Sequence, residues 1–94
     1  MNQTQACQLC GLLKRTHWYY ECDDYVICDC LTCGVPMLVW REHTMRVNYV
    51  ALNEGLARLA KYAIQKWGRS LLIFFRFNQR QIPDHFHVHA EKDE

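Results

Sequence analysis

The segment LNEGLARLAKYAIQKWG, residues 52–68, decides the fold class of this chain. Apolar residues recur in it every three or four positions, which places them along one face of an α-helix. They are Leu52, Leu56, Leu59, Ala60, Ala63, Ile64 and Trp67. The opposite face carries polar side chains, namely Arg58, Lys61, Gln65 and Lys66. This pattern predicts one long amphipathic helix that packs its apolar face on a second layer.

The two ends of this helix carry their own signals. Asn48 or Asn53 is a suitable N-cap, and Glu54 favours the positive end of the helix dipole. Gly68 follows Trp67 and predicts a left-handed C-cap, because glycine has no Cβ to oppose positive φ.

The segments on both sides of the helix have the composition of strands. HWYYE (17–21) and YVIC (25–28) flank a short CDD turn and predict a hairpin. The further predicted strands are PMLVWRE (36–42), SLLIFFRF (70–77) and HFHVHA (85–90). The order ββ-β-α-β-β predicts one α+β domain over residues 1–94. We expect a mostly antiparallel five-stranded sheet with the helix packed on it.

Composition and charge narrow the class of protein. The 94 residues suit one domain, and 50% hydrophobic and 13% aromatic residues predict a folded globule. A formal net charge of +1 argues against a nucleic-acid partner. The longest apolar run, 71–75, is too short to span a bilayer, so we expect no membrane contact. The start MNQTQACQ lacks an export pattern, and we expect a cytoplasmic protein with reduced thiols.

Four of the six cysteines form two similar turns, CQLCG at 7–11 and CLTCG at 30–34. Cys-x-x-Cys turns followed by glycine point two thiolates at one ion, and antiparallel pairing of the hairpin would bring Cys10 close to Cys30. The sequence therefore predicts a structural Zn²⁺ site made of Cys7, Cys10, Cys30 and Cys33. Disulfides and reactive thiols are the alternatives. Cys22 and Cys28 lie in or beside the strands, and we expect them to be small buried hydrophobes.

Three histidines alternate with apolar residues near the end of the chain, at His85, His87 and His89. In a strand they share one face, while Phe86 and Val88 point into the core. Spacing alone leaves three interpretations open. The histidines bind a metal, or one of them attacks a phosphate, or they belong to a solvated terminal strand.

HFHVHA resembles the signature of the histidine triad family, in which three histidines alternate with apolar residues. THWYYECDDYVICD (16–29) is similar to that family's first hairpin, and residues 34–63 are similar to its third strand and long helix. The resemblance covers residues 16–90. It implies a nucleotide hydrolase or transferase acting on an α-phosphate, with a nucleotide substrate and a homodimeric assembly.

The resemblance also implies roles for single residues. His87 would attack phosphorus and form a nucleotidyl-histidine intermediate, His89 would bind the phosphate oxygens, and His85 would orient His87 through its backbone. In the preceding QIPDH, Gln81 matches the family pattern, while Ile82 stands in place of its serine. Arg76 and Arg80 are the candidates to supply phosphate contacts instead.

The family's zinc ligands would correspond to Cys7, Cys10, His43 and His85. This set competes with the four-cysteine set, because strand 36–42 spans roughly 20 Å and separates Cys33 from His43. The four-cysteine set is favoured and the other is kept as the alternative. A non-enzymatic zinc-binding module for protein or nucleic-acid interaction is the alternative function. A third possible function is that of a metal enzyme in which His85, His87 and His89 bind a second ion.

Overall fold

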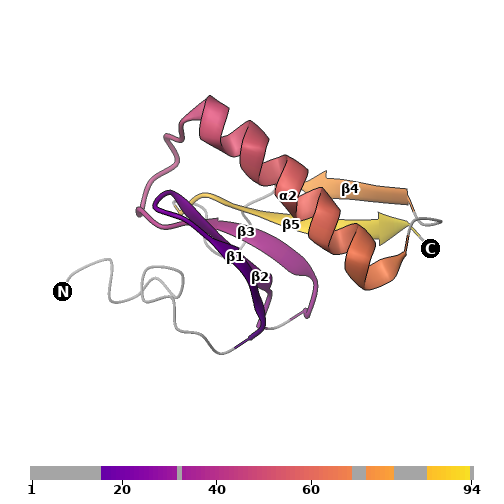
Figure 1. Cartoon of the computed structure of the whole chain (residues 1–94). Coiled ribbons are helices and arrows are strands. Elements are labelled where there is room, and N and C mark those ends of the chain that lie inside the picture. The colour runs from indigo at the N-terminus through magenta and orange to yellow at the C-terminus, as the bar shows by residue number, and fades with distance from the viewer. Residues whose placement is uncertain (1–15, 32, 69–71, 78–84, 94) are drawn as a thin grey trace.

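The computed structural model describes residues 16–31, 33–68, 72–77 and 85–93. In these ranges the chain forms five strands and one helix (Figure 1). They are β1 (Trp18–Glu21), β2 (Tyr25–Asp29), β3 (Pro36–Trp40), α2 (Tyr49–Trp67), β4 (Leu72–Arg76) and β5 (His87–Asp93). The predicted α+β class and the order ββ-β-α-β-β are both confirmed. No helix in the described ranges combines the length and apolar character needed to cross a membrane.

The five strands form one sheet in the order β1-β2-β3-β5-β4, and every neighbouring pair is antiparallel. The last strand of the chain is therefore an interior strand, inserted between β3 and β4. Its residue His89 is paired with Met37 on one side and with Arg76 on the other. The helix lies across one face of this sheet (Figure 1).

Two predicted strands, 36–42 and 85–90, differ from the structure by two or more residues at an end, and the described ends of the other three differ by at most one residue. β3 ends at Trp40 instead of residue 42, and the chain then bends through residues 41–48 toward the helix. β5 begins at His87 instead of residue 85, and it continues to Asp93 because its charged end pairs with β4. The sequence pattern did not predict this extension, because residues 91–93 are all charged and lack the alternation of apolar and polar residues that marks a strand.

The helix begins at Tyr49, as the first of the two predicted N-caps requires. The side chain of Asn48 accepts hydrogen bonds from the backbone N–H groups of Val50 (2.8 Å) and Ala51 (3.2 Å). Asn48 is thus the N-cap, and the alternative cap at Asn53 is wrong. Gly68 has the predicted positive φ of 95°, but its ψ of 161° is extended and not left-handed helical.

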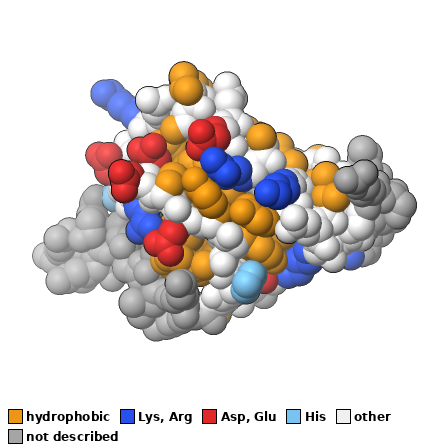
Figure 2. Space-filling view, viewed as in Figure 1, with side chains coloured by type: hydrophobic (Ala, Val, Ile, Leu, Met, Phe, Trp, Pro, Cys, Tyr) orange, Lys and Arg blue, Asp and Glu red, His pale blue; other side chains and the backbone are white. Residues whose placement is uncertain are grey.

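Alternation along the strands gives the sheet two different faces. The helix-side core consists of Tyr25, Ile27, Leu38, Trp40, Leu52, Leu59, Ala63, Phe86, Val88 and Ala90. The opposite face, here called the histidine face, consists of Val26, Cys28, Met37, Val39, His87 and His89. Phe86 and Val88 point into the core as predicted, so the histidine side chains of β5 lie on the face away from the helix. On the helix side, acidic and basic side chains both occur at the surface (Figure 2).

Gly55 sets how closely α2 approaches the sheet. A Cβ at this position would lie 2.5 Å from Leu38 Cδ1 and 3.2 Å from Tyr25 Cζ. Both of those side chains are fully buried and have little room to move. A glycine in the middle of a helix lowers its intrinsic stability, but here it allows close contact between the helix and β2 and β3.

Gly55→Ala is expected to lower the free energy of unfolding by about 1–2 kcal/mol, because overpacking outweighs the gain in helix propensity. Asn53→Ala, on the exposed side of the same helix, is the matched control and is expected to be neutral or slightly stabilising. Urea unfolding of both variants measures the difference. A Gly55→Ala protein as stable as the unmodified chain would contradict the close packing.

Candidate metal centre

The CLTCG turn joins β2 to β3 and is closed by its own backbone. The N–H of Gly34 donates to the carbonyl of Cys30 (2.9 Å), and the N–H of Cys30 donates to the carbonyl of Val35 (2.8 Å). Gly34 has a φ of 73°, a conformation that glycine adopts without strain. The turn therefore holds Cys30 and Cys33 together at the end of the sheet where β3 begins.

The last turn of α2 anchors this CLTCG turn. The ammonium group of Lys66 donates to the carbonyl of Gly34 (2.9 Å) and pairs with the carboxylate of Asp29 (3.1 Å). The hydroxyl of Tyr19 donates to the same carboxylate (2.8 Å). These contacts tie the helix, β1 and the end of β2 to the residues that flank the two cysteines.

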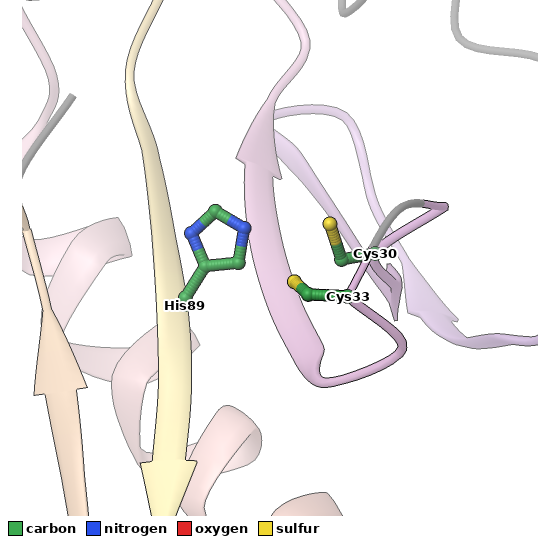
Figure 3. Close-up of side chains that lie close together, drawn as sticks. All are labelled: Cys30, Cys33 and His89. Carbon is green, nitrogen blue, oxygen red and sulfur yellow. The ribbon is translucent and has the colours of Figure 1, made fainter. Parts of the chain in front are cut away.

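The third member of the cluster is His89, which reaches it from β5. A ring nitrogen of His89 and the sulfurs of Cys30 and Cys33 all lie within 4.8 Å of one another. In Figure 3 one ring nitrogen of His89 is turned toward the two sulfurs. Ligands of a tetrahedral zinc ion are roughly 3.5–3.8 Å apart, as bond lengths of about 2.0–2.3 Å require. These three side chains therefore form a cluster that could hold a metal ion after a small inward movement.

His89 is suited electronically to bind a cation. Burial, followed by the nearby charges of Arg76 and His87, lowers the pKa of His89 to about 4. The imidazole is therefore neutral at physiological pH, and one nitrogen keeps its lone pair. Within the described part of the chain, Nδ1 of His89 is buried without a hydrogen-bond partner. Nδ1 is the nitrogen next to the ring carbon that carries the Cβ, and in Figure 3 it points away from the sulfurs, so Nε2 is the nitrogen that an ion at the two cysteines would use.

The cysteines differ in their surroundings. Cys33 is exposed and Cys30 is half-buried, and neither is part of a disulfide. Burial of the sulfur, together with its hydrogen bond to Cys30, raises the pKa of Cys33, so metal binding would release protons from the pair. Burial also raises the pKa of Cys28 to about 11, and its side chain lies in the histidine face. Cys28 is the small buried hydrophobe predicted from the sequence, and Cys22 is half-buried against the helix-side core.

His43 and His85 meet at the other end of β3. Nε2 of His85 donates to the carbonyl of Trp40 (2.6 Å), and its Nδ1 lies 3.3 Å from Nδ1 of His43. His85 is fully buried and precedes β5. The two predicted ligand sets are thus separated along β3, in agreement with the argument that Cys33 and His43 cannot share one ion.

His87 lies between these two groups. Its Nδ1 is 2.8 Å from the carbonyl oxygen of His85, and because a carbonyl can only accept, this nitrogen carries the proton. The lone pair of the neutral ring is then on Nε2. The predicted backbone orientation of His87 by His85 is present. All three histidines are at most 9% exposed and β5 is an interior strand, so the interpretation as a solvated strand is wrong.

Several predicted site residues lie outside the described residues, namely Cys7, Cys10, Arg80 and Gln81, with the whole turn 7–11. Arg76 is described, and its guanidinium pairs with the carboxylate of Glu91 (2.6 Å) beside His89. The association of His89 with Cys30 and Cys33 was not predicted. The alternating pattern showed which face His89 occupies, but only the pairing of β5 with β3 shows which turn it reaches.

The lowered pKa of His89 predicts a pH-dependent stability. Between pH 6.5, the ordinary pKa, and about 4, the unfolded chain binds a proton that the folded chain does not. The metal-free protein is therefore expected to lose on the order of 3 kcal/mol of stability as pH falls from 7 to 4. Urea unfolding with a chelator present measures this loss. His89→Gln should lack this part of the pH dependence, and an unchanged dependence would contradict the assignment.

Comparison with known proteins does not place the chain in a family. No protein-family model matches the sequence. No curated protein and no solved structure is significantly similar to it. The proposals that follow therefore depend on the geometry of the cysteine and histidine side chains.

Proposed function

We propose that this chain is a zinc-binding domain in which Cys30, Cys33 and His89 hold Zn²⁺. The convergence of two thiols and one imidazole, from a turn and an interior strand, carries this proposal. His89 lies 56 positions after Cys33 and 59 after Cys30, so the three side chains are brought together by the fold and not by local sequence spacing.

The donor set favours zinc over the other common divalent ions. Thiolate and imidazole ligands suit zinc, whereas magnesium and calcium prefer oxygen ligands. The neutral imidazole of His89 can bind without first losing a proton. The positive charge of the ion would in turn favour the thiolate forms of both cysteines. The observed side chains therefore fit a zinc ion.

Such an ion would act as a cross-link within the sheet. It would join the turn that precedes β3 to the middle of β5, on the face that α2 does not cover. A structural zinc site usually has four protein ligands. We propose that the fourth is a thiolate of the predicted N-terminal pair, Cys7 or Cys10.

Metal analysis after dialysis tests this proposal. The reduced chain is expected to retain one zinc per molecule. Cys33→Ser and His89→Gln are each expected to weaken binding by roughly 100-fold or more, because each removes a direct ligand. Cobalt substitution should show thiolate charge-transfer absorption that both variants diminish.

Cys22→Ser is the matched control, because Cys22 packs against the other face of the sheet. It should bind zinc as tightly as the unmodified chain. Cys7→Ser and Cys10→Ser identify the fourth ligand by the same measurement. Full zinc occupancy in both Cys33→Ser and His89→Gln would show that the ligand set is wrong.

A second candidate function is nucleotidyl transfer through His87. The observation that favours it is the bond from Nδ1 of His87 to the carbonyl of His85, which leaves the lone pair on Nε2. A neutral imidazole held in one tautomer is a suitable nucleophile for phosphorus. The antiparallel sheet with one helix between β3 and β4 agrees with the resemblance to the histidine triad family.

The two candidate functions make competing demands on His89. A histidine bound to zinc through one nitrogen has less freedom to contact a phosphate oxygen, as the family resemblance would require. Arg76 is held by Glu91 beside His89 and could serve as a phosphate partner. The predicted homodimer and nucleotide substrate belong to this second candidate.

A nucleoside phosphoramidate assay tests the second candidate. Loss of the nucleophile is expected to lower turnover by at least about 1000-fold in His87→Ala. His17→Ala, a change at an exposed histidine of the hairpin, is the matched control and should retain full activity. No turnover by the unmodified chain, or equal turnover by His87→Ala, would contradict this function.

A further inference from the structure

We infer that Cys30 and Cys33 are a reversible redox-modification site, at which a peroxide forms a disulfide and expels the metal. This inference deepens the proposed zinc function and rests on it. The reagent would be a peroxide, and the zinc ion that it displaces would have a structural role.

The two sulfurs are arranged for intramolecular oxidation. They lie within 4.8 Å of each other in one short turn, and neither is part of a disulfide. Cys33 is exposed, so a small oxidant can reach its sulfur, and Cys30 is half-buried behind it. An accessible sulfur beside a second sulfur can form a disulfide, and in the zinc-bound form the positive ion would keep both sulfurs as thiolates, the form that reacts with a peroxide.

The reaction balances with one peroxide. The Cys33 thiolate attacks the O–O bond, forming a sulfenic acid and releasing hydroxide, which is protonated to water. The Cys30 thiolate then attacks the sulfenic sulfur, forming the S–S bond and releasing the second oxygen as water after protonation. In total, two thiolates, one hydrogen peroxide and two protons give one disulfide and two waters. Sulfur is oxidised, peroxide oxygen is reduced, and the metal leaves as Zn²⁺.

The CLTCG turn can form a disulfide and keep the hydrogen bonds that hold it in place. Its closing hydrogen bonds are made by backbone groups of Cys30, Gly34 and Val35 and use neither sulfur. Lys66 also contacts the turn through the carbonyl of Gly34. Among the described cysteines, Cys28 is buried on the histidine face and Cys22 lies against the other core. The paired thiols of the turn are therefore the described thiols best placed to join.

Disulfide formation would remove two of the three described metal ligands at once. His89 and the proposed fourth ligand together would make only a weak zinc site, because stable sites use three or four protein ligands. The released imidazole would then be available on the histidine face, where its ring centroid lies 5.4 Å from that of His87. Oxidation would thus convert a metal ligand into an imidazole that holds no metal, beside the proposed nucleophile.

The test treats the full-length, zinc-loaded chain with hydrogen peroxide and follows zinc release with a chromogenic chelator. Peptide mapping without reduction locates any disulfide. We expect zinc release together with a Cys30–Cys33 disulfide, and recovery of zinc binding after treatment with a thiol reductant. Retention of zinc, or release with a disulfide at other cysteines, would overturn the inference.

Cys33→His supplies the control, because imidazole keeps a metal donor but cannot form a disulfide. Its zinc release by peroxide is expected to be at least about tenfold slower than that of the unmodified chain. Equal release would overturn the inference. If Cys33→His does not fold, the peptide map of the unmodified chain decides alone. A reduced chain that binds no zinc refutes the proposed function instead, and disulfide mapping still distinguishes that result.

Discussion

The insertion of β5 between β3 and β4 is the constraint on which the rest of the structure depends. It pairs His89 with Met37, just beyond the turn that carries Cys30 and Cys33. It also gives β5 two neighbouring strands, so that its histidines are buried although they lie close to the end of the chain. A terminal strand at the sheet edge would have left these imidazoles in water and away from the thiols.

The histidines near β5 are consequently held by different parts of the structure. His85 is anchored to the carbonyl of Trp40 and contacts His43, at the end of β3 far from the cysteines. His87 is oriented by the carbonyl of His85. His89 faces the thiols of the CLTCG turn. One regular sequence pattern therefore yields three environments, because each imidazole meets a different segment of the neighbouring chain.

The helix supports the same site indirectly. Gly55 allows α2 to lie close to β2 and β3. In the last turn of the helix, the ammonium group of Lys66 donates a hydrogen bond to the carbonyl of Gly34. The position of the thiols is thus coupled to the packing of the core. A metal ion at the cluster would complete this arrangement on the histidine face, where the helix contributes no cover.

The linear sequence is enough to predict the class of the fold, the single amphipathic helix, the approximate strands and the chemistry available in the cysteines and histidines. These features follow from local periodicity and residue type. It did not determine that β5 is an interior strand, that its paired length extends to Asp93, or that His89 joins Cys30 and Cys33. Those features were decided by the tertiary structure, because strand order and register depend on contacts between residues that are distant in the sequence, 48 to 52 positions apart for β3 with β5 and 13 to 21 for β4 with β5.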